Sequence, residues 1–221
     1  TQLSFEIKVV SSRPANLEGY TIEATRNGST VSATIGIALD HSIRYALNHL
    51  LRWSQGSDKE LKVEDGPDFS IRGVVEGFYG KPWSHEQRIR GLKNFGDFNM
   101  NTYFLAPKDV PWQRFNWRQP FDTEFLTKTA ELTEIGRKNA IDIVTCVSPG
   151  LSVKYCDESD VDAVLTRYKQ LFDLGARHFG MLWDDIAWEL QHQEDIDTYV
   201  STAAAHADFT NRVWNKLIAL D

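Results

Sequence analysis

Residues 178–188 read HFGMLWDDIAW, a short apolar run that ends in two adjacent aspartates, Asp184 and Asp185. A compact apolar run bounded by polar residues indicates a buried strand. Short apolar runs of this kind recur from about Ile71 onward. They predict four strands, at residues 72–76, 101–105, 141–147 and 178–184. Helical patterns separate them at 84–95, 123–139 and 160–174, with one more at 195–220. Alternating strands and helices predict a parallel sheet.

Polar or charged residues follow each predicted strand. They are Glu76, Lys108 with Asp109, Ser148, and the Asp184–Asp185 pair. An open doubly wound sheet and a (β/α)8 barrel both fit the alternation. Chemistry at the carboxyl ends of several strands favours the barrel, and no glycine-rich phosphate loop follows the first strand. Because such a barrel needs roughly 250 residues, we expect only its first half here, completed by further chain or by a second chain.

The first part of the sequence has a different pattern. Apolar residues alternate with polar ones at 3–9, 20–24 and 31–35, and Asn27-Gly28 predicts a hairpin between the last two runs. Asp40 is the expected N-cap of a helix with an apolar face at Ile43, Ala46, Leu47, Leu50 and Leu51. A polar connection with one short strand follows at 54–69. The sequence thus predicts a small α+β domain at 1–68 and part of a (β/α)8 domain at 69–221.

The composition excludes several classes of function. The chain has 221 residues, 42% of them hydrophobic, and a net charge of −7, which disfavours nucleic-acid and anionic-membrane partners. No apolar stretch approaches a membrane span, and the first residues do not resemble a signal peptide. Cys146 and Cys156 are expected to be free thiols, because two cysteines do not make a disulfide framework. The presence of two cysteines does not distinguish a cytoplasmic protein from a secreted one.

Asp184 and Asp185 are the strongest candidates for catalysis. Two adjacent carboxylates repel each other, so one resists ionisation and the pair can supply an acid and a base. A glycosidase needs both functions. Other interpretations are a helix N-cap beside a solvated neighbour, or an Mg²⁺ ligand pair. The magnesium interpretation lacks a phosphate loop, and no clustered histidines support a metal hydrolase.

Two further segments carry candidate binding residues. In RGVVEGFYGKPW, residues 72–83, Gly77 and Tyr79 could line a ligand site, although a plain turn also explains the glycines. Glu76 could be an active-site acid or a buried polar residue. In NTYFLAPKDVPW, residues 101–112, Lys108 is either a solvated lysine or, beside carboxylates, a donor to sugar hydroxyls.

Four motifs together resemble glycoside hydrolase family 84, the O-GlcNAcases and bacterial β-N-acetylglucosaminidases, some of which are called hyaluronidases. The motifs are VVEGFYGKPW, LAPKDVPW, VSPGLSVKY and LWDDIAW, in the order and spacing of that family. The resemblance covers roughly residues 70 to 215. The first segment resembles the small domain that precedes the barrel in bacterial members. Val110 departs from the family, because many members carry a second acid there.

The resemblance implies a retaining hydrolysis of terminal β-linked GlcNAc through an oxazoline, without a protein nucleophile, metal or organic cofactor. Asp184 would orient the acetamido group, and Asp185 would be the general acid and then the general base. Gly77, through its carbonyl, and Lys108 would hold sugar hydroxyls, and Tyr79 would line the pocket. The implied partner is a GlcNAc-bearing glycoprotein or glycan. A truncated, non-catalytic carbohydrate-binding protein is the alternative, because several sugar-holding residues of the family would lie beyond Asp221.

Overall fold

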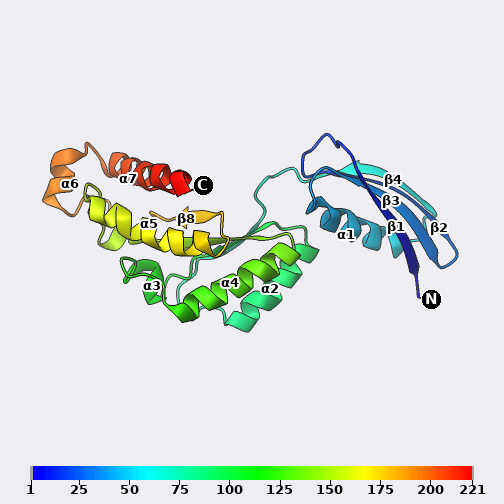
Figure 1. The fold of residues 1–221 in the computed structure, drawn as a ribbon, viewed down its shortest axis with the longest axis horizontal. Helices are drawn as coiled ribbons and strands as arrows, with labels where there is room; N and C mark the ends of the chain where they lie inside the picture. Colours follow the sequence, from blue (N-terminus) through cyan, green and yellow to red (C-terminus); the bar gives the residue numbers. More distant parts are fainter. Residues whose placement is uncertain (1, 221) are drawn as a thin grey trace. The chain divides into compact units, whose positions relative to one another are not determined.

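The structure is a computed structural model that describes residues 2–220, and it contains two compact units. One unit runs to Arg72 and includes Lys93–Asn101, and the other comprises Gly73–Leu92 and the chain from Thr102 onward. Figure 1 labels most of the elements of both units. The domain boundary predicted after residue 68 stays a prediction. No helix of the described residues has the length and apolarity needed to cross a membrane.

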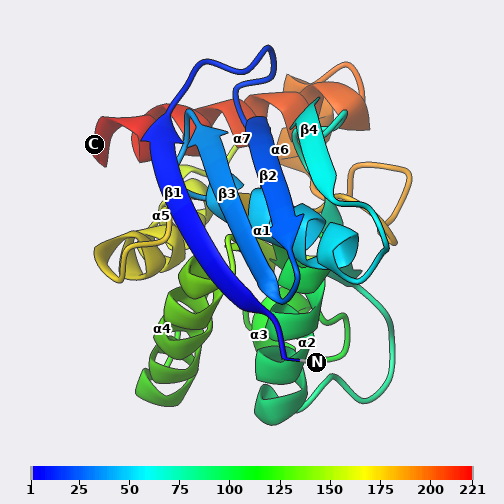
Figure 2. The same cartoon turned by 90° about the vertical axis from the view of Figure 1, so that its right-hand side faces the viewer.

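The first unit is a four-stranded sheet with one helix. Its elements are β1 (Ser4–Ser11), β2 (Tyr20–Asn27), β3 (Thr30–Ile37), α1 (Ser42–Ser54) and β4 (Glu60–Asp65). The strand order is β1-β3-β2-β4, with β1 parallel to β3 and the other pairs antiparallel (Figure 2). Alternate apolar residues of β2 and β3 pack with α1 into a buried core that includes Ile22, Val31, Ile35, Tyr45 and Leu50.

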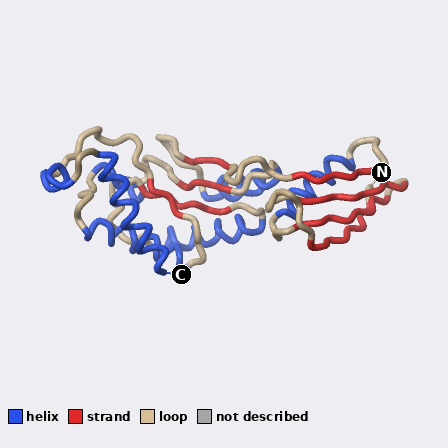
Figure 3. Tube along the Cα trace, turned by 90° about the horizontal axis from the view of Figure 1, so that it is seen from above, coloured by secondary structure: helices blue, strands red, loops and turns tan. Residues whose placement is uncertain are grey.

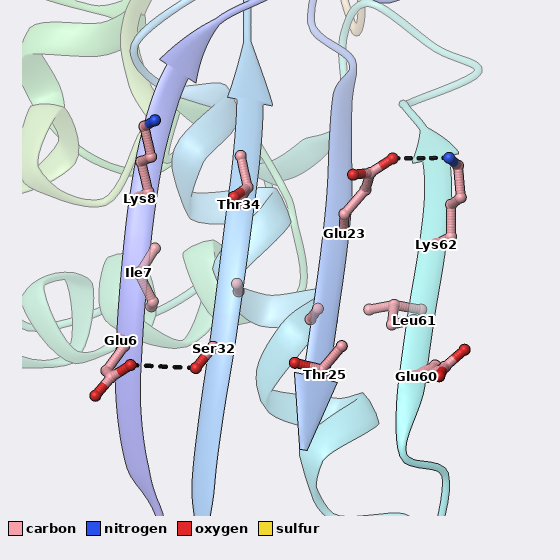
Figure 4. A pocket seen from close by; sticks show the side chains of 12 residues that line it. Glu6, Ile7, Lys8, Glu23, Thr25, Ser32, Thr34, Glu60, Leu61 and Lys62 are labelled. Carbon is pink, nitrogen blue, oxygen red and sulfur yellow. Dashed lines mark hydrogen bonds and ion pairs between the residues drawn. The ribbon is translucent and has the colours of Figure 1, made fainter. Parts of the chain in front are cut away.

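The opposite face of this sheet is polar. Figure 4 shows the side chains that line a shallow hollow on it, from Glu6 and Lys8 on β1 to Lys62 on β4. Lys62 pairs with Glu23 at 2.8 Å, and Ser32 donates a hydrogen bond to Glu6. Acidic and basic groups are mixed there, which is typical of a solvated sheet face.

The predicted hairpin is present, but its turn lies one residue later than the Asn27-Gly28 motif suggests. Asn27 still pairs with Thr30, so Gly28 and Ser29 form the two-residue loop. Gly28 has a φ of +60°, as the first central position of a type II′ turn requires. The prediction that Asp40 caps α1 is wrong. His41 occupies the N-cap position, and no side chain caps this helix end.

The second unit alternates strands and helices, as the sequence predicts (Figure 3). The strands β5 (Gly73–Glu76), β6 (Thr102–Leu105), β7 (Asp142–Val147) and β8 (Phe179–Met181) form a parallel sheet in that order. The helices are α2 (His85–Asp97), α3 (Pro111–Arg114), α4 (Thr123–Lys138), α5 (Glu158–Asp173), α6 (Gln193–Thr198) and α7 (Thr202–Leu217), with short 3₁₀ turns at Pro149–Leu151 and Ile218–Leu220.

Helices α2, α4 and α5 each end in the same turn before the next strand. The residue after the C-cap is Asn99, Ala140 or Gly175, and each has a positive φ. At the end of α4, Ile141 N donates to Gly136 O and Ala140 N donates to Arg137 O. These two bonds define a Schellman motif, which satisfies the last carbonyls of the helix. The repetition of this turn gives each helix–strand connection the same geometry.

Three sequence predictions in this unit are settled by local hydrogen bonds. Ser84 with Gln87 three residues later is a capping-box pattern that predicts the start of a helix, and the box is confirmed because Ser84 N donates to Gln87 Oε1 and Gln87 N donates to Ser84 Oγ. The last predicted strand is too long, since β8 ends at Met181 and not at residue 184. The predicted helix at 195–220 is wrong as a single element. It is divided because Tyr199 is extended and Ser201 caps a new helix by accepting from Ala204 N.

The main core of the second unit lies around β7, α5 and α7. Its buried members include Trp117, Val147, Val161, Val164, Tyr168, Ala205, Phe209 and Val213. A smaller cluster, Ala106, Val144 and Cys146, lies below the ends of β6 and β7. These apolar groups support the strand ends that carry the candidate site.

Candidate active site

Tyr79, Lys108, Asp184 and Asp185 gather at one edge of the parallel sheet. They follow β5, β6 and β8 respectively, and the carboxyl ends of parallel strands meet at the same edge. Sequence analysis singled out all four as candidates. The structure brings their side chains into one hydrogen-bonded cluster, although Tyr79 and Asp185 are 106 residues apart in the sequence.

Lys108 is the buried centre of this cluster. Only 3% of the residue is exposed, so the interpretation as a solvated lysine is wrong. Its Nζ lies 2.6 Å from Asp184 Oδ2 and 3.6 Å from Asp185 Oδ2. The backbone N–H of Lys108 donates to Phe78 O, which ties the loop after β6 to the loop after β5. The Lys108 ammonium therefore lies within ion-pair distance of both carboxylates.

The two aspartates remain open to solvent, and neither caps a helix. Their side chains are 58% and 51% exposed, and the next helix, α6, begins only after His192. The interpretation of Asp184 as a helix N-cap is therefore wrong. Asp185 has a φ of +55°, a left-handed conformation that is uncommon outside glycine. Such strain gathers at functional sites, where the surrounding structure holds it in place.

Tyr79 and Arg114 complete the surroundings of Asp185. Tyr79 OH donates to Asp185 Oδ2 at 2.8 Å. Arg114 donates from one guanidinium nitrogen to Tyr79 OH at 2.8 Å and from the other to Asp185 O at 2.7 Å. Sequence analysis missed Arg114. The available signal was an arginine six residues after Lys108, in the loop beyond the same strand end.

The electrostatics differ from what two adjacent carboxylates alone suggest. The pKa of Asp185 lies below its usual value, chiefly because Tyr79 donates to the carboxylate and also because Lys108 and Arg114 place positive charge beside it. Asp185 is therefore not a carboxyl of the pair that resists ionisation. The cations and donors of the folded chain outweigh the neighbouring negative charge.

Glu76 is a structural residue and not an exposed acid. It is fully buried, and its carboxylate accepts two hydrogen bonds from Arg88, each of 2.8 Å, and one from Tyr103. Trp83 N also donates to it, which closes the loop that carries Gly77 and Tyr79. Of the two interpretations that the sequence left open, the buried polar residue is confirmed.

Two glycines shape the loop after β5. Gly77 is the first residue beyond the strand, and a Cβ there would lie 3.0 Å from Val75 Cγ1. Gly80 has a φ of +92°, and its N–H donates to Asp109 Oδ2 at 2.6 Å. The second glycine thus permits the turn that joins this loop to the Lys108 loop. The role of Gly77 as a sugar-binding carbonyl stays a prediction.

Both cysteines are free, as the sequence predicted. Cys146 lies in the small apolar cluster on β7, and burial, together with the negative charge of Asp184, raises its pKa to about 12. A thiol with so high a pKa is unreactive near neutral pH. Cys146 therefore supports the site by packing.

A family model described as beta-N-acetylglucosaminidase matches residues 72–221. This chain belongs to that family. The protein O-GlcNAcases of mouse and rat are 29% and 32% identical to it over 195 residues, which is 88% of this chain. The chain spans only 21% of the length of either relative.

Two solved structures have a similar fold. CpGH84B superposes with a TM-score of 0.76 at 31% identity, over 94% of this chain and 35% of that one. A mutant O-GlcNAc hydrolase of Thermobaculum terrenum gives a TM-score of 0.67 at 34% identity, over 68% of this chain and 33% of that one. The resemblance inferred from the four motifs is thereby confirmed at the level of the family.

Proposed function

We propose that this chain carries the catalytic carboxylates of a retaining β-N-acetylglucosaminidase that hydrolyses terminal β-linked GlcNAc. The observation that carries the proposal is the cluster in which buried Lys108 contacts both Asp184 and Asp185 beside Tyr79. Family membership and the names of the relatives support the reaction class. The substrate would be a GlcNAc-bearing glycoprotein or glycan.

In the proposed reaction, Asp185 donates its proton to the leaving oxygen while the acetamido oxygen of the sugar attacks the anomeric carbon. The glycosidic bond breaks, and an oxazoline forms. Asp184 holds the acetamido N–H and stabilises the positive charge that develops on the ring. Asp185 then removes a proton from water, which opens the oxazoline and releases GlcNAc with retained configuration. Gly77 and Lys108 hold the sugar hydroxyls.

Lys108 would have to change partners when substrate binds. In the free protein its ammonium contacts both aspartates, and it would turn toward a sugar hydroxyl in the complex. Loss of that cation raises the pKa of Asp185 and favours the protonated acid. The pH dependence of kcat/KM reports the pKa values of the free protein, and the pH dependence of kcat reports those of the complex with substrate. The fall of kcat at high pH should therefore occur at a higher pH than the fall of kcat/KM.

The parallel sheet is proposed to be the first half of a (β/α)8 barrel. Its strand order, β5-β6-β7-β8, follows the chain without reversal, whereas a doubly wound sheet reverses at a switch point. Further chain, or a second chain, would supply the remaining strands and the rest of the sugar pocket.

The test is hydrolysis of aryl β-N-acetylglucosaminides by the 221-residue chain and by its Asp185→Asn variant. Asparagine keeps an acceptor for Tyr79 and tolerates the positive φ, whereas alanine would add backbone strain. We expect a loss of about 10²- to 10⁴-fold with a poor leaving group and a smaller loss with a good one, which needs little acid help.

Two further variants sharpen this experiment. Asp184→Asn should slow the reaction even with a good leaving group, because oxazoline formation no longer has its charge partner. Asp142→Asn is the matched control, since Asp142 lies at the amino end of β7 and pairs with His178. Equal losses for good and poor leaving groups in Asp185→Asn would remove the acid role. Binding of GlcNAc without turnover would support the non-catalytic alternative.

A further inference from the structure

Arg114 has an unusual position for a buried arginine beside two aspartates. Only 5% of the residue is exposed, yet both of its site hydrogen bonds go to neutral oxygens, the hydroxyl of Tyr79 and the backbone carbonyl of Asp185. Its guanidinium also lies 5.8 Å from the centre of the Tyr79 ring. The side chain therefore contacts the backbone carbonyl of Asp185 directly and is linked to its carboxylate only through Tyr79.

The hydrogen-bond directions in this chain of groups are fixed by chemistry. A guanidinium can only donate, so the Tyr79 oxygen accepts from Arg114. Tyrosine has a single hydroxyl proton, which is then left for Asp185 Oδ2. At the other end, Arg114 donates to the carbonyl of a residue with a φ of +55°. One side chain thus restrains both the backbone and the carboxylate of Asp185.

We propose that Arg114 is a positioning residue that holds Asp185 in its catalytic orientation, directly through the backbone carbonyl and indirectly through Tyr79. The inference rests on the proposed role of Asp185 as the acid. It adds a residue that acts through two others and does not touch the sugar.

The segment that carries Arg114 is itself held rigidly. Pro111 begins α3, and Ser148 N, at the end of β7, donates to Gln113 O at 2.9 Å. Arg167 of α5 is buried and donates to Trp112 O and Trp117 O, at 2.7 and 2.9 Å. Anchors on both sides of Arg114 fix its position before substrate binds, as a preorganised site requires.

The inference predicts how Asp185 titrates. The charged and titratable groups that face it are Tyr79 after β5, Lys108 after β6, Arg114 on α3 and the neighbouring Asp184. Replacing Arg114 by methionine removes a positive charge and frees the Tyr79 hydroxyl to turn away. Both effects disfavour the carboxylate, so the pKa of Asp185 should rise.

The experiment is a carbon-13 NMR titration of the Asp185 carboxyl in the 221-residue chain. We expect Arg114→Met to raise the pKa, and Arg114→Lys to raise it less, because an ammonium keeps the charge but cannot reproduce the planar fork. Arg118→Met is the matched control. Arg118 anchors the same segment through Asp160 and Ser152, away from the site, so its loss should leave the titration unchanged.

Tyr79→Phe keeps the test decisive if Arg114→Met does not fold. It removes only the hydroxyl, and it should also raise the pKa of Asp185. In a protein that turns over substrate, Arg114→Met should lower kcat for a substrate with a poor leaving group by on the order of 10²-fold. It should also move the fall of kcat at high pH to a higher pH.

The possible results separate this inference from the proposed function. An unchanged Asp185 titration in Arg114→Met, or a wild-type titration in Arg114→Lys, would overturn the positioning role whatever the activity. An equal rise of the Asp185 pKa in Arg118→Met would mean that any disturbance of the loop packing has this effect. That result would also overturn the positioning role. If the pKa moves as expected but the protein hydrolyses no aryl β-N-acetylglucosaminide even when the remaining strands of the barrel are supplied, the proposed function fails while the link between Arg114 and Asp185 stands.

Discussion

Asp185 shows how a single residue can be defined by contacts from distant parts of the chain. Its carboxylate accepts from Tyr79, its carbonyl accepts from Arg114, and Lys108 lies 3.6 Å from its Oδ2. None of these partners is within 70 residues of it in the sequence. The left-handed φ of Asp185 is therefore held by tertiary contacts, which also make it sensitive to changes in residues that never meet the substrate.

Glu76 stabilises the loop that carries Tyr79, and its replacement tests how much this contributes to stability. Glu76→Gln would leave Arg88 with a buried charge and no carboxylate, so we expect the free energy of unfolding to fall by about 3 kcal/mol. Urea denaturation measures this. Glu134→Gln is the control, because Glu134 pairs with Arg137 on an exposed helix face and its loss should hardly move the midpoint. A similar loss in both variants would mean that the buried pair contributes nothing special.

At the scale of elements, the Schellman turns after α2, α4 and α5 explain why β6, β7 and β8 start where they do. The motif needs a left-handed residue, and the chain supplies Asn99, Ala140 and Gly175 in turn. Asparagine and glycine tolerate this conformation, whereas alanine has a Cβ that clashes with the following carbonyl. The turn after α4 therefore forms against a local conformational cost.

Ala140→Gly should relieve that cost. We expect the protein to become more stable by about 0.5–1 kcal/mol, since removal of the left-handed strain exceeds the extra entropy of glycine in the unfolded chain. Thermal or urea denaturation would show the gain. Ala130→Gly, in the middle of the same helix, should instead destabilise by about 1 kcal/mol. A loss of stability in both variants would contradict the strain argument.

At the scale of the whole molecule, the larger hydrophobic cores of the two units serve different purposes. One lies between α1 and its antiparallel-rich sheet, and the other lies around β7, α5 and α7. All the candidate site residues belong to the unit of the second core. The stability of the site should therefore depend on the second core.

Ile22→Ala tests this separation. Ile22 is fully buried in the first core, and its truncation should cost about 2–5 kcal/mol. Hydrogen exchange should become faster in β2 and β3 but not in β7, because local stability follows the contacts of each unit. Phe209→Ala, in the second core, is the reciprocal variant and should affect β7. Equal effects on both sheets in either variant would show that the two units unfold together.

The sequence by itself determined the alternation of strands and helices and the small sheet before it, together with the candidates Tyr79, Lys108, Asp184 and Asp185. These features depend on periodicity, local caps and motifs, which are properties of neighbouring residues. It also determined the family, because four motifs in fixed order carry the resemblance.

Only the tertiary structure decided how those residues meet. It placed Lys108 between the aspartates, paired Glu76 with Arg88, lowered the pKa of Asp185 and brought Arg114 to the site. It also divided the predicted last helix at Tyr199–Ser201. For the residues around Asp185, the physical reason is the same. Burial, charge neutralisation and a strained backbone arise from contacts between strand ends far apart in the chain, and no local pattern of residues records such contacts.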